Sequence, residues 1–202
     1  MKNIVISIGR EYGSGGKYIG KEVAKRLNIN CYDKELIQKI YEKNGGNYSK
    51  LLEYDEMKKN KMLKTMELLS GIPENAFEDD QYQVLMDSTI KELAESESCV
   101  IIGRNSNNIL KDYKNVIKIF IYSNDLEFKV KRKMEIENLS YEEALKRLKN
   151  IDKQRRKYYE NVSKNSNWGD RKGYDFLIDS SVLGIEKTVD LIIDIYNHYQ
   201  KI

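Results

Sequence analysis

Arg10-Glu11-Tyr12-Gly13-Ser14-Gly15-Gly16-Lys17 is the stretch of this chain that decides its fold. It follows an apolar segment, Ile4–Ile8, and precedes a helical pattern of apolar residues that runs from Lys17 to Leu27. Strand, glycine-rich turn, basic residue and helix in this order are typical of a protein that holds phosphate. Glycines let backbone N–H groups turn inward, the helix N-terminus adds positive potential, and the lysine adds a full charge. The stretch therefore predicts a nucleotide-binding loop.

Composition and charge narrow the class of protein. A chain of 202 residues suffices for one α/β domain, and 40% apolar with 33% charged residues fits a globular protein. The 35 basic and 32 acidic residues give a net charge of only +3, which does not favour a protein that coats nucleic acid. The apolar run near the N-terminus has about five residues, against the ~20 that a membrane span needs. We therefore expect a cytoplasmic protein with no membrane or nucleic-acid partner.

Few side chains are available for metal binding or nucleophilic chemistry. Cys31 and Cys99 lie far apart in apolar stretches, and we interpret them as buried, reduced thiols. The single histidine, His198, lies near the end of the chain. The sequence thus has no metal-ligand spacing of cysteine and histidine, and it gives no indication of a histidine base.

Five short apolar runs predict the strands of one sheet. They are Ile4–Ile8, Ile29–Tyr32, Cys99–Ile102, Val116–Ile121 and Phe176–Ile178. Continuous apolar runs that alternate with helical patterns indicate a parallel sheet covered by helices on both faces. We therefore predict an α/β fold of three layers with a five-stranded parallel sheet.

Periodic apolar residues and capping signals predict the helices between these strands. After the first helix we expect helices at Lys34–Tyr41 and at Asp79–Ala94, the latter with Val84, Leu85, Ile90 and Leu93 on one stripe. Further helices are expected to start after Asp125, at a capping box formed by Ser140 and Glu143, and at Ile185, from which the last helix runs to about Tyr199. Two helical excursions, residues 43–98 and 133–157, interrupt the strand–helix alternation.

Polar residues follow each predicted strand. They are Gly13 to Lys17, Asp33, Gly103-Arg104, Ser123 to Asp125, and Asp179-Ser180-Ser181. Ligands of parallel α/β sheets bind beyond the carboxyl ends of the strands, where these five groups converge. The convergence predicts one ligand site at that edge, although Asp179 is favoured as a cap of the following turn and Trp168 as a residue that packs a loop.

The glycine-rich stretch matches the phosphate-loop pattern G-x-x-x-x-G-K-[S/T] in two incomplete ways. With Gly16-Lys17 as the Gly-Lys pair, Tyr18 takes the place of the hydroxyl that binds Mg²⁺. With Gly13 and Gly15 as the loop glycines, Gly16 takes the lysine position and Lys17 comes one residue late. Ser14 is then one candidate ligand for the metal, and the alternative is a metal held by water and phosphate alone.

Several stretches resemble the cytidylate kinase-like family within the P-loop nucleoside monophosphate kinases. They are G-R-E-Y-G-S-G-G-K-Y-I-G at 9–20, C-V-I-I-G-R at 99–104, I-K-I-F-I-Y-S at 117–123, V-K-R-K-M at 130–134, I-D-K-Q-R-R-K-Y-Y at 151–159 and Y-D-F-L-I-D-S-S-V-L-G-I-E at 174–186. The resemblance implies a P-loop kinase fold in a single domain, 1–202. Its core would be 1–42, 99–132 and 158–202, its helical acceptor-binding insert 43–98, and its lid 133–157.

The same resemblance implies a reaction and residue roles. ATP, with Mg²⁺, would phosphorylate a nucleoside monophosphate, most simply CMP or dCMP. The resemblance implies that the catalytic cations are Lys17, Arg132, Arg155 and Arg156. It implies donor-binding roles for Gly13, Ser14, Gly15, Gly16, Lys17 and Tyr18, with Ser14 also the metal ligand. It implies acceptor-binding roles for Arg10, Asp33, Arg104 and Asp152.

Two other functions stay open at this level. Tyr18 at the hydroxyl position of the first alignment, and Gly16 at the lysine position of the second, each fit a catalytically weak regulator that binds nucleotide without turnover. Arg155-Arg156-Lys157 beside Tyr158-Tyr159 is the kind of basic and aromatic stretch that grips nucleic-acid strands. Because this basic stretch is short and the net charge of the chain is small, nucleic-acid binding is the least favoured of the three functions.

Overall fold

The computed structural model describes residues 3–33, 76–163 and 168–201. The chain divides into two compact units, one formed by Met1–Tyr32 with Ile90–Ile202 and the other by Asp33–Thr89. The sheet and the candidate site lie in the first unit. The predicted helix Lys34–Tyr41 and residues 43–75 of the predicted insert lie outside the described residues.

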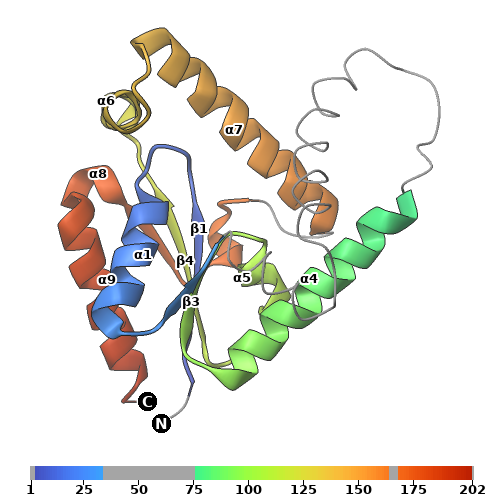
Figure 1. Ribbon diagram of the computed structural model, residues 1–202. Coiled ribbons are helices and arrows are strands. Elements are labelled where there is room, and N and C mark those ends of the chain that lie inside the picture. The colour runs from blue at the N-terminus through green and yellow to red at the C-terminus, as the bar shows by residue number, and fades with distance from the viewer. Residues whose placement is uncertain (1–2, 34–75, 164–167, 202) are drawn as a thin grey trace. The chain divides into compact units, whose positions relative to one another are not determined.

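Among the described residues, five parallel strands form a sheet in the order β2-β3-β1-β4-β5 (Figure 1). The strands are β1 (Val5–Arg10), β2 (Asn30–Tyr32), β3 (Cys99–Ile102), β4 (Val116–Tyr122) and β5 (Phe176–Asp179). The predicted α/β class with a five-stranded parallel sheet is confirmed. The main difference is at β1, which continues two residues beyond its predicted end and so includes Arg10.

Alternation along the central strand directs its side chains to two layers of helices. Ile6 and Ile8 are fully buried in the main core cluster, which also contains residues of α1 and α9. Ser7 points to the opposite face, where its hydroxyl lies 2.6 Å from that of Ser106 at the start of α5. Because both faces of β1 are covered, its sequence is nearly continuous in apolar residues.

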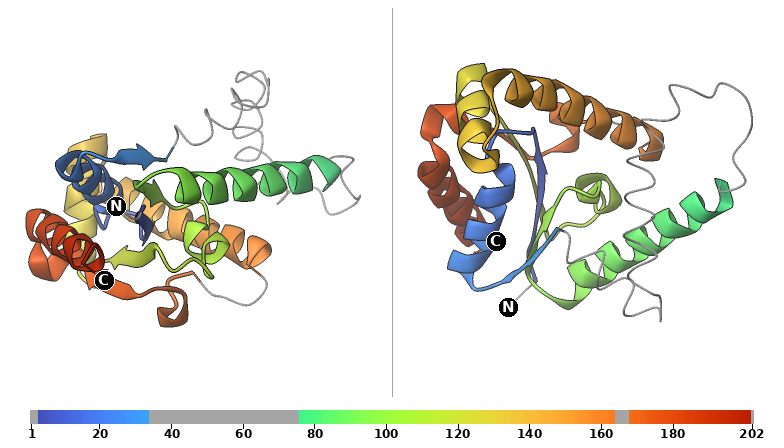
Figure 2. Two further views of the ribbon diagram at one scale, coloured as in Figure 1. Left: turned by 90° about the horizontal axis from the view of Figure 1, so that it is seen from below. Right: turned by 45° about the horizontal axis from the view of Figure 1, so that its top comes forward.

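Three helices lie on one face of the sheet (Figures 1 and 2). They are α1 (Gly16–Leu27), α8 (Ser180–Leu183) and α9 (Ile185–Tyr199). Ile19 and Val23 of α1 meet Val189 and Ile192 of α9 in the main core, and all four are fully buried. This contact fixes α1, and with it the loop that precedes the helix, against the sheet.

The opposite face carries α5 (Ser106–Ile109). The helix α4 (Ala76–Ser96) runs from the second unit into the first, where Asn115 Nδ2 donates a hydrogen bond of 3.1 Å to the carbonyl of Ala94. The predicted apolar stripe of α4 is wrong at Val84, which is 68% exposed, whereas Ile90 is fully buried.

A helical hairpin of α6 (Leu126–Glu137) and α7 (Tyr141–Val162) lies at the carboxyl ends of the strands (Figure 1). Asp125 caps α6 by accepting from Phe128 N, and the predicted capping box of Ser140 and Glu143 opens α7. A 3₁₀ turn, η1 (Arg171–Gly173), precedes β5. None of the described helices is long and apolar enough to cross a membrane.

Candidate active site

The phosphate loop joins β1 to α1 through two glycines in the left-handed region. Gly13 has φ of +87° and Gly15 has φ of +82°, a conformation that other residues adopt only with strain. Steric crowding also requires glycine at both positions. A Cβ on Gly13 would lie 2.8 Å from Lys129 Cβ, and a Cβ on Gly15 would overlap Ile185 Cδ1. Since Gly15 directly precedes α1, the geometry favours the alignment in which Gly13 and Gly15 are the loop glycines.

Hydrogen bonds from neighbouring elements hold this loop. Asp152 of α7 accepts from the backbone N–H of Tyr12 at 2.7 Å, and Ser180 Oγ donates to the carbonyl of Ser14 at 2.7 Å. Within the loop, Ser14 Oγ donates to the carbonyl of Glu11 at 2.9 Å. The N–H groups of the first turn of α1 have no carbonyl partner within the helix, and such groups typically bind an anion.

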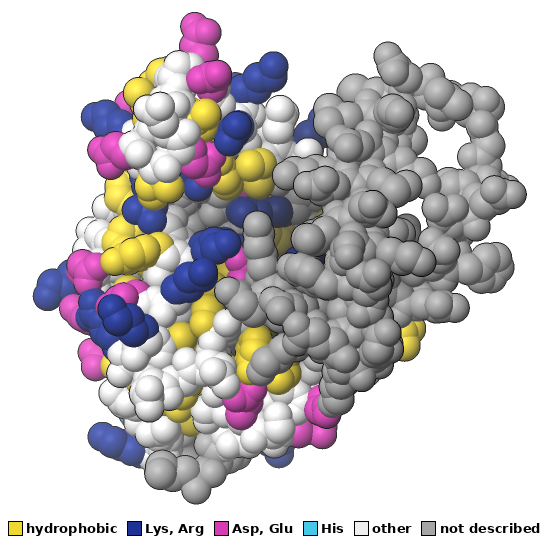
Figure 3. Space-filling model, viewed as in Figure 1, with side chains coloured by type: hydrophobic (Ala, Val, Ile, Leu, Met, Phe, Trp, Pro, Cys, Tyr) yellow, Lys and Arg dark blue, Asp and Glu magenta, His cyan; other side chains and the backbone are white. Residues whose placement is uncertain are grey.

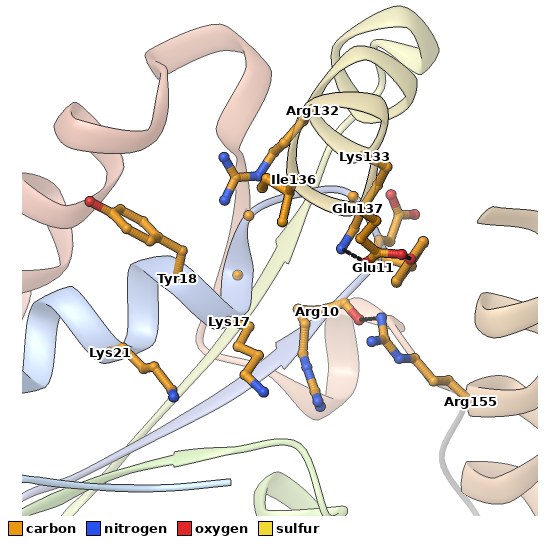
Figure 4. A pocket seen from close by; sticks show the side chains of 14 residues that line it. Arg10, Glu11, Lys17, Tyr18, Lys21, Arg132, Lys133, Ile136, Glu137 and Arg155 are labelled. Atoms are coloured by element: carbon orange, nitrogen blue, oxygen red, sulfur yellow. Dashed lines mark hydrogen bonds and ion pairs between the residues drawn. The ribbon is translucent and has the colours of Figure 1, made fainter. Parts of the chain in front are cut away.

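A cavity of about 410 Å³ opens along the loop, α1 and the α6–α7 hairpin (Figure 4). Six cationic side chains and two carboxylates, Glu11 and Glu137, line it. The cationic residues are Arg10, Lys17, Lys21, Arg132, Lys133 and Arg155. Lysine and arginine side chains also gather near the centre of the face shown in Figure 3. This excess of positive charge suits a ligand with several negative charges, such as a triphosphate.

Glu137 connects the loop to both helices of the hairpin. Its carboxylate accepts from Tyr12 Oη at 2.6 Å, Lys133 Nζ at 2.7 Å and Arg147 Nη1 at 2.8 Å. Burial alone would favour the neutral acid, yet the bonds from Lys133, Tyr12 and Arg147 lower the pKa of Glu137 to about 2. Burial and the bond to this carboxylate raise the pKa of Tyr12 to about 12. Tyr12 therefore stays a neutral donor.

Arg132 projects from α6 toward the first turn of α1. Its guanidinium lies 5.8 Å from the centroid of the Tyr18 ring, within the range of a cation–π contact. Burial lowers the pKa of Arg132, against the opposing effect of Tyr18 and Glu135, but an arginine stays charged at neutral pH. A partly desolvated cation of this kind interacts strongly with phosphate.

Arg155 reaches the loop from α7. Its Nη1 donates to the carbonyl of Arg10 at 3.1 Å and to Asp152 Oδ1 at 3.3 Å. Burial raises the pKa of Asp152, while the N–H of Tyr12 and the charge of Arg155 act in the opposite direction. Asp152 thus contacts an arginine of the cavity and also fixes the loop backbone, whereas its predicted acceptor-binding role stays a prediction.

Other predicted site residues lie elsewhere. Arg156 is not among the residues that line the main cavity. Its guanidinium lies 5.9 Å from the Trp168 ring centroid, beside a separate hollow of about 270 Å³. Arg155 and Arg156 thus diverge, which does not favour a continuous nucleic-acid-binding patch. Arg104 follows β3 with φ of +57° and does not line the main cavity either. Asp33 is buried and belongs to the second unit.

The loop offers Mg²⁺ little from the protein side. Ser14 Oγ is fully buried and bonded to main-chain carbonyls, so its geometry argues against the predicted role as a metal ligand. The residues of the described chain contain no cluster of three histidine, cysteine or carboxylate side chains that could hold a metal. Ser14 Oγ therefore serves the loop backbone, and the carboxylates that line the cavity are Glu11 and Glu137.

Several site residues were not predicted from the sequence. Lys21, Lys133 and Glu137 line the cavity. The four-residue spacing of Lys133 and Glu137 signals an ion pair on a helix, but it does not reveal that the pair faces the loop. Tyr12 carried no signal, because only the tertiary structure places it on the α6–α7 hairpin.

The model of the cytidylate kinase-like family matches residues 5–182 of this chain. The chain belongs to the cytidylate kinase-like family. The crystal structure of an uncharacterized protein from Eubacterium ventriosum is 30% identical, with 96% of this chain and 99% of that chain covered and a TM-score of 0.73. The comparison with curated proteins found no match.

Shikimate kinases share the fold of this cytidylate kinase-like chain at lower identity. The enzyme from Acinetobacter baumannii, solved with shikimate, is 13% identical with a TM-score of 0.50, and 96% of this chain and 92% of that chain are covered. The enzyme from Bacteroides thetaiotaomicron is 16% identical with a TM-score of 0.50, and 96% of this chain and 98% of that chain are covered. These likenesses show that the fold is one used by small-molecule kinases.

Proposed function

We propose that this protein transfers the γ-phosphoryl group of ATP to a nucleoside monophosphate, with CMP and dCMP as the first candidates. The observation that carries the proposal is the phosphate loop opening into a cavity lined by six cationic side chains, in a chain of the cytidylate kinase-like family. A cavity of about 410 Å³ accommodates a polyphosphate with part of a nucleoside.

The chemistry of phosphoryl transfer matches such a site. The transition state is loose and spreads negative charge over the equatorial oxygens, so the protein supplies position and positive charge rather than covalent steps. Arg132 of α6 and Arg155 of α7 provide planar guanidinium groups, which meet two oxygens at once. The acceptor phosphate is itself the nucleophile, so the reaction needs no strong base.

Mg²⁺, when bound by the nucleotide, neutralises charge on the β- and γ-phosphates. The protein's own part is the set of cations around the loop. Lys17 at the first turn of α1 and Lys133 on α6 line the cavity, which supports a role for both in holding donor oxygens.

A nucleotide-binding regulator is the second candidate function. The supporting observation is that Ser14 Oγ is buried among carbonyls and that Lys17, in the alignment with Gly13 and Gly15 as loop glycines, stands in place of a small hydroxyl residue. Such a protein would bind nucleotide without turnover.

A coupled ADP-release assay with ATP and Mg²⁺ tests the proposal, with CMP, dCMP, UMP, AMP, GMP or no acceptor. We expect turnover that depends on one acceptor and falls by about 10²- to 10³-fold in Arg132→Ala, because one strong electrostatic donor is worth that much. Arg171→Ala, on an exposed residue of η1, is the matched control and should keep full activity.

Absence of turnover with every acceptor, while ATP still raises the melting temperature, would favour the regulator over the kinase. ADP release of equal rate with and without acceptor would contradict transfer to a nucleotide and indicate hydrolysis instead.

A further inference from the structure

Gly16 stands where the phosphate-loop pattern carries its lysine. In G-x-x-x-x-G-K the lysine directly follows the second loop glycine. In this loop the second glycine with a positive φ is Gly15, and Gly16 is the first residue of α1. Lys17 comes one residue later, and 3.6 residues per turn rotate it by about 100° around the helix from the usual position.

The space beside Gly16 is filled by Arg10. A Cβ on Gly16 would lie 2.5 Å from Arg10 Cβ and 3.2 Å from Arg10 Cγ, so neither lysine nor alanine fits there without displacement. Arg10 is the last residue of β1, and its side chain emerges on the same face of the sheet as α1. The aliphatic stem of Arg10 therefore occupies the room that a lysine stem would take.

The guanidinium of Arg10 extends from the loop to the end of β3. A Cβ on Gly103, which has φ of +76°, would overlap Arg10 Nη1 and lie 2.9 Å from Arg10 Cζ. Gly103 is followed by Arg104 and Asn105, both with φ of +57°. Three successive left-handed residues, two of them not glycine, mark a strained turn of the kind found at functional sites.

A buried contact holds this strained turn in place. Asn105 is 4% exposed, and its Oδ1 accepts from Ser163 Oγ at 2.9 Å at the end of α7. Arg10 is thus placed between two fixed elements, the phosphate loop and the Gly103–Asn105 turn. It also lines the main cavity, where its side chain hangs beside that of Lys17 (Figure 4).

We infer that Arg10 replaces the loop lysine as the catalytic cation and contacts the phosphoryl group during transfer; this inference rests on the proposed function. The bond from the γ-phosphorus to the β–γ bridging oxygen breaks, and ADP leaves with the electron pair. A bond forms between the γ-phosphorus and an oxygen of the acceptor phosphate. Arg10 keeps its proton and donates hydrogen bonds to oxygens of the moving group. Lys17 holds donor oxygens that do not move.

Steady-state kinetics on Arg10→Met and Lys17→Met separate the two cations. Methionine keeps an unbranched stem for packing against Gly16 but has no charge. We expect Arg10→Met to lower kcat by about 10³-fold, the lower limit for a catalytic arginine. Lys17→Met should lose about tenfold in kcat/KM, and Lys25→Met, on the exposed face of the same helix, should lose nothing. A loss in Lys17→Met as large as that in Arg10→Met would overturn the inference.

A wild type without turnover would contradict the proposed function but not the inference about Arg10. Binding measurements test the inference in that case. Calorimetry gives the affinities for ADP and for a non-hydrolysable ATP analogue. We expect the added affinity due to the γ-phosphate to disappear in Arg10→Met and to persist in Lys17→Met. Persistence in Arg10→Met would overturn the inference.

Thermal unfolding checks that Arg10→Met is folded. If it is not, Arg10→Gln carries the test, because glutamine keeps an unbranched polar side chain but has no charge. We expect its kcat to fall by about 10²-fold or more, and wild-type kcat in Arg10→Gln would overturn the inference.

Discussion

Gly15 shows at the scale of one residue why the phosphate loop tolerates so little variation. Its left-handed φ and its proximity to Ile185 act together, since the first disfavours any side chain and the second leaves no room for a methyl group. The loop shape is therefore a property of glycine itself, and the positions of the helix N–H groups depend on it.

We expect Gly15→Ala to destabilise the protein by about 1–3 kcal/mol and to weaken ATP binding. The physical reason is backbone strain combined with overlap at Ile185 Cδ1. Thermal melts with and without ATP measure both effects. Gly173→Ala is the control, because that glycine has no positive φ and a Cβ there would make ordinary contacts with Asn107 Nδ2 at 3.4 Å and Tyr159 Oη at 3.9 Å. Equal behaviour of the two variants would contradict the expectation.

The lowered pKa of Glu137 predicts that the free energy of unfolding depends on pH. Its pKa falls from the usual 4.5 to about 2 in the folded chain, so the unfolded chain binds this proton first as pH decreases. The stabilisation, up to about 3 kcal/mol, is complete above about pH 4.5 and is lost as pH falls toward 2. We expect the melting temperatures of wild type and Glu137→Gln to differ most at pH 6 and to converge below pH 4. Glu160→Gln, exposed on α7, should follow the wild type, and a constant gap for Glu137→Gln would refute the explanation.

At the scale of elements, α7 fixes two parts of the site at once. Asp152 near its middle accepts from Tyr12 N of the phosphate loop, and Ser163 at its end donates to Asn105 of the turn after β3. Tyr159 Oη also accepts from Asn107 Nδ2 of α5 at 2.5 Å. A single helix therefore holds both the loop and the β3 turn, which is a role beyond the lid and the charged site residues predicted for 133–157.

Asp152→Ala tests the contact between α7 and the loop. The change leaves the N–H of Tyr12 without its acceptor and removes the partner that orients Arg155. We expect a loss of about 1–3 kcal/mol in unfolding free energy and a fall of about tenfold in ATP affinity. Glu160→Ala removes a carboxylate from the same helix at an exposed position and should change neither quantity. Wild-type ATP affinity in Asp152→Ala would show that α7 does not hold the loop.

At the scale of the whole molecule, the buried sheet of the first unit forms most of its core. The candidate site lies at the carboxyl ends of the strands. Strands β1, β3 and β4 are almost wholly buried between the helical layers, whereas the hairpin of α6 and α7 has only a small core of its own. That second core includes Tyr12, Val130, Ala144 and Leu148. The hairpin and the loop are thus the parts of this unit on which a ligand has the greatest effect.

Hydrogen exchange measures this division. We expect the backbone amides of β1, β3 and β4 to exchange most slowly in the free protein. Saturating ATP should slow exchange in residues 11–18 and in α6 and α7 on the order of 10- to 100-fold. Protection confined to α9, far along the chain from the loop, would contradict the assignment of the cavity as the nucleotide site.

The sequence by itself determined the sheet, the phosphate loop and the family. Hydrophobic runs and glycine positions are local signals, so most of β1 and a glycine-rich turn at Gly13–Gly16 could be predicted from neighbouring residues, whereas the structure decided between the two alignments of the loop. The capping box at Ser140 could be predicted for the same reason.

Only the tertiary structure decided which charged groups share the site. Arg155 and Arg156 are adjacent in sequence, but the rotation of about 100° per residue along α7 sends one to the loop and the other to Trp168. Arg10 lies against Gly16 and Gly103 because β1 and β3 are neighbours in a sheet although some 90 residues separate them. Contacts of this kind depend on how strands and helices pack, which no local pattern encodes.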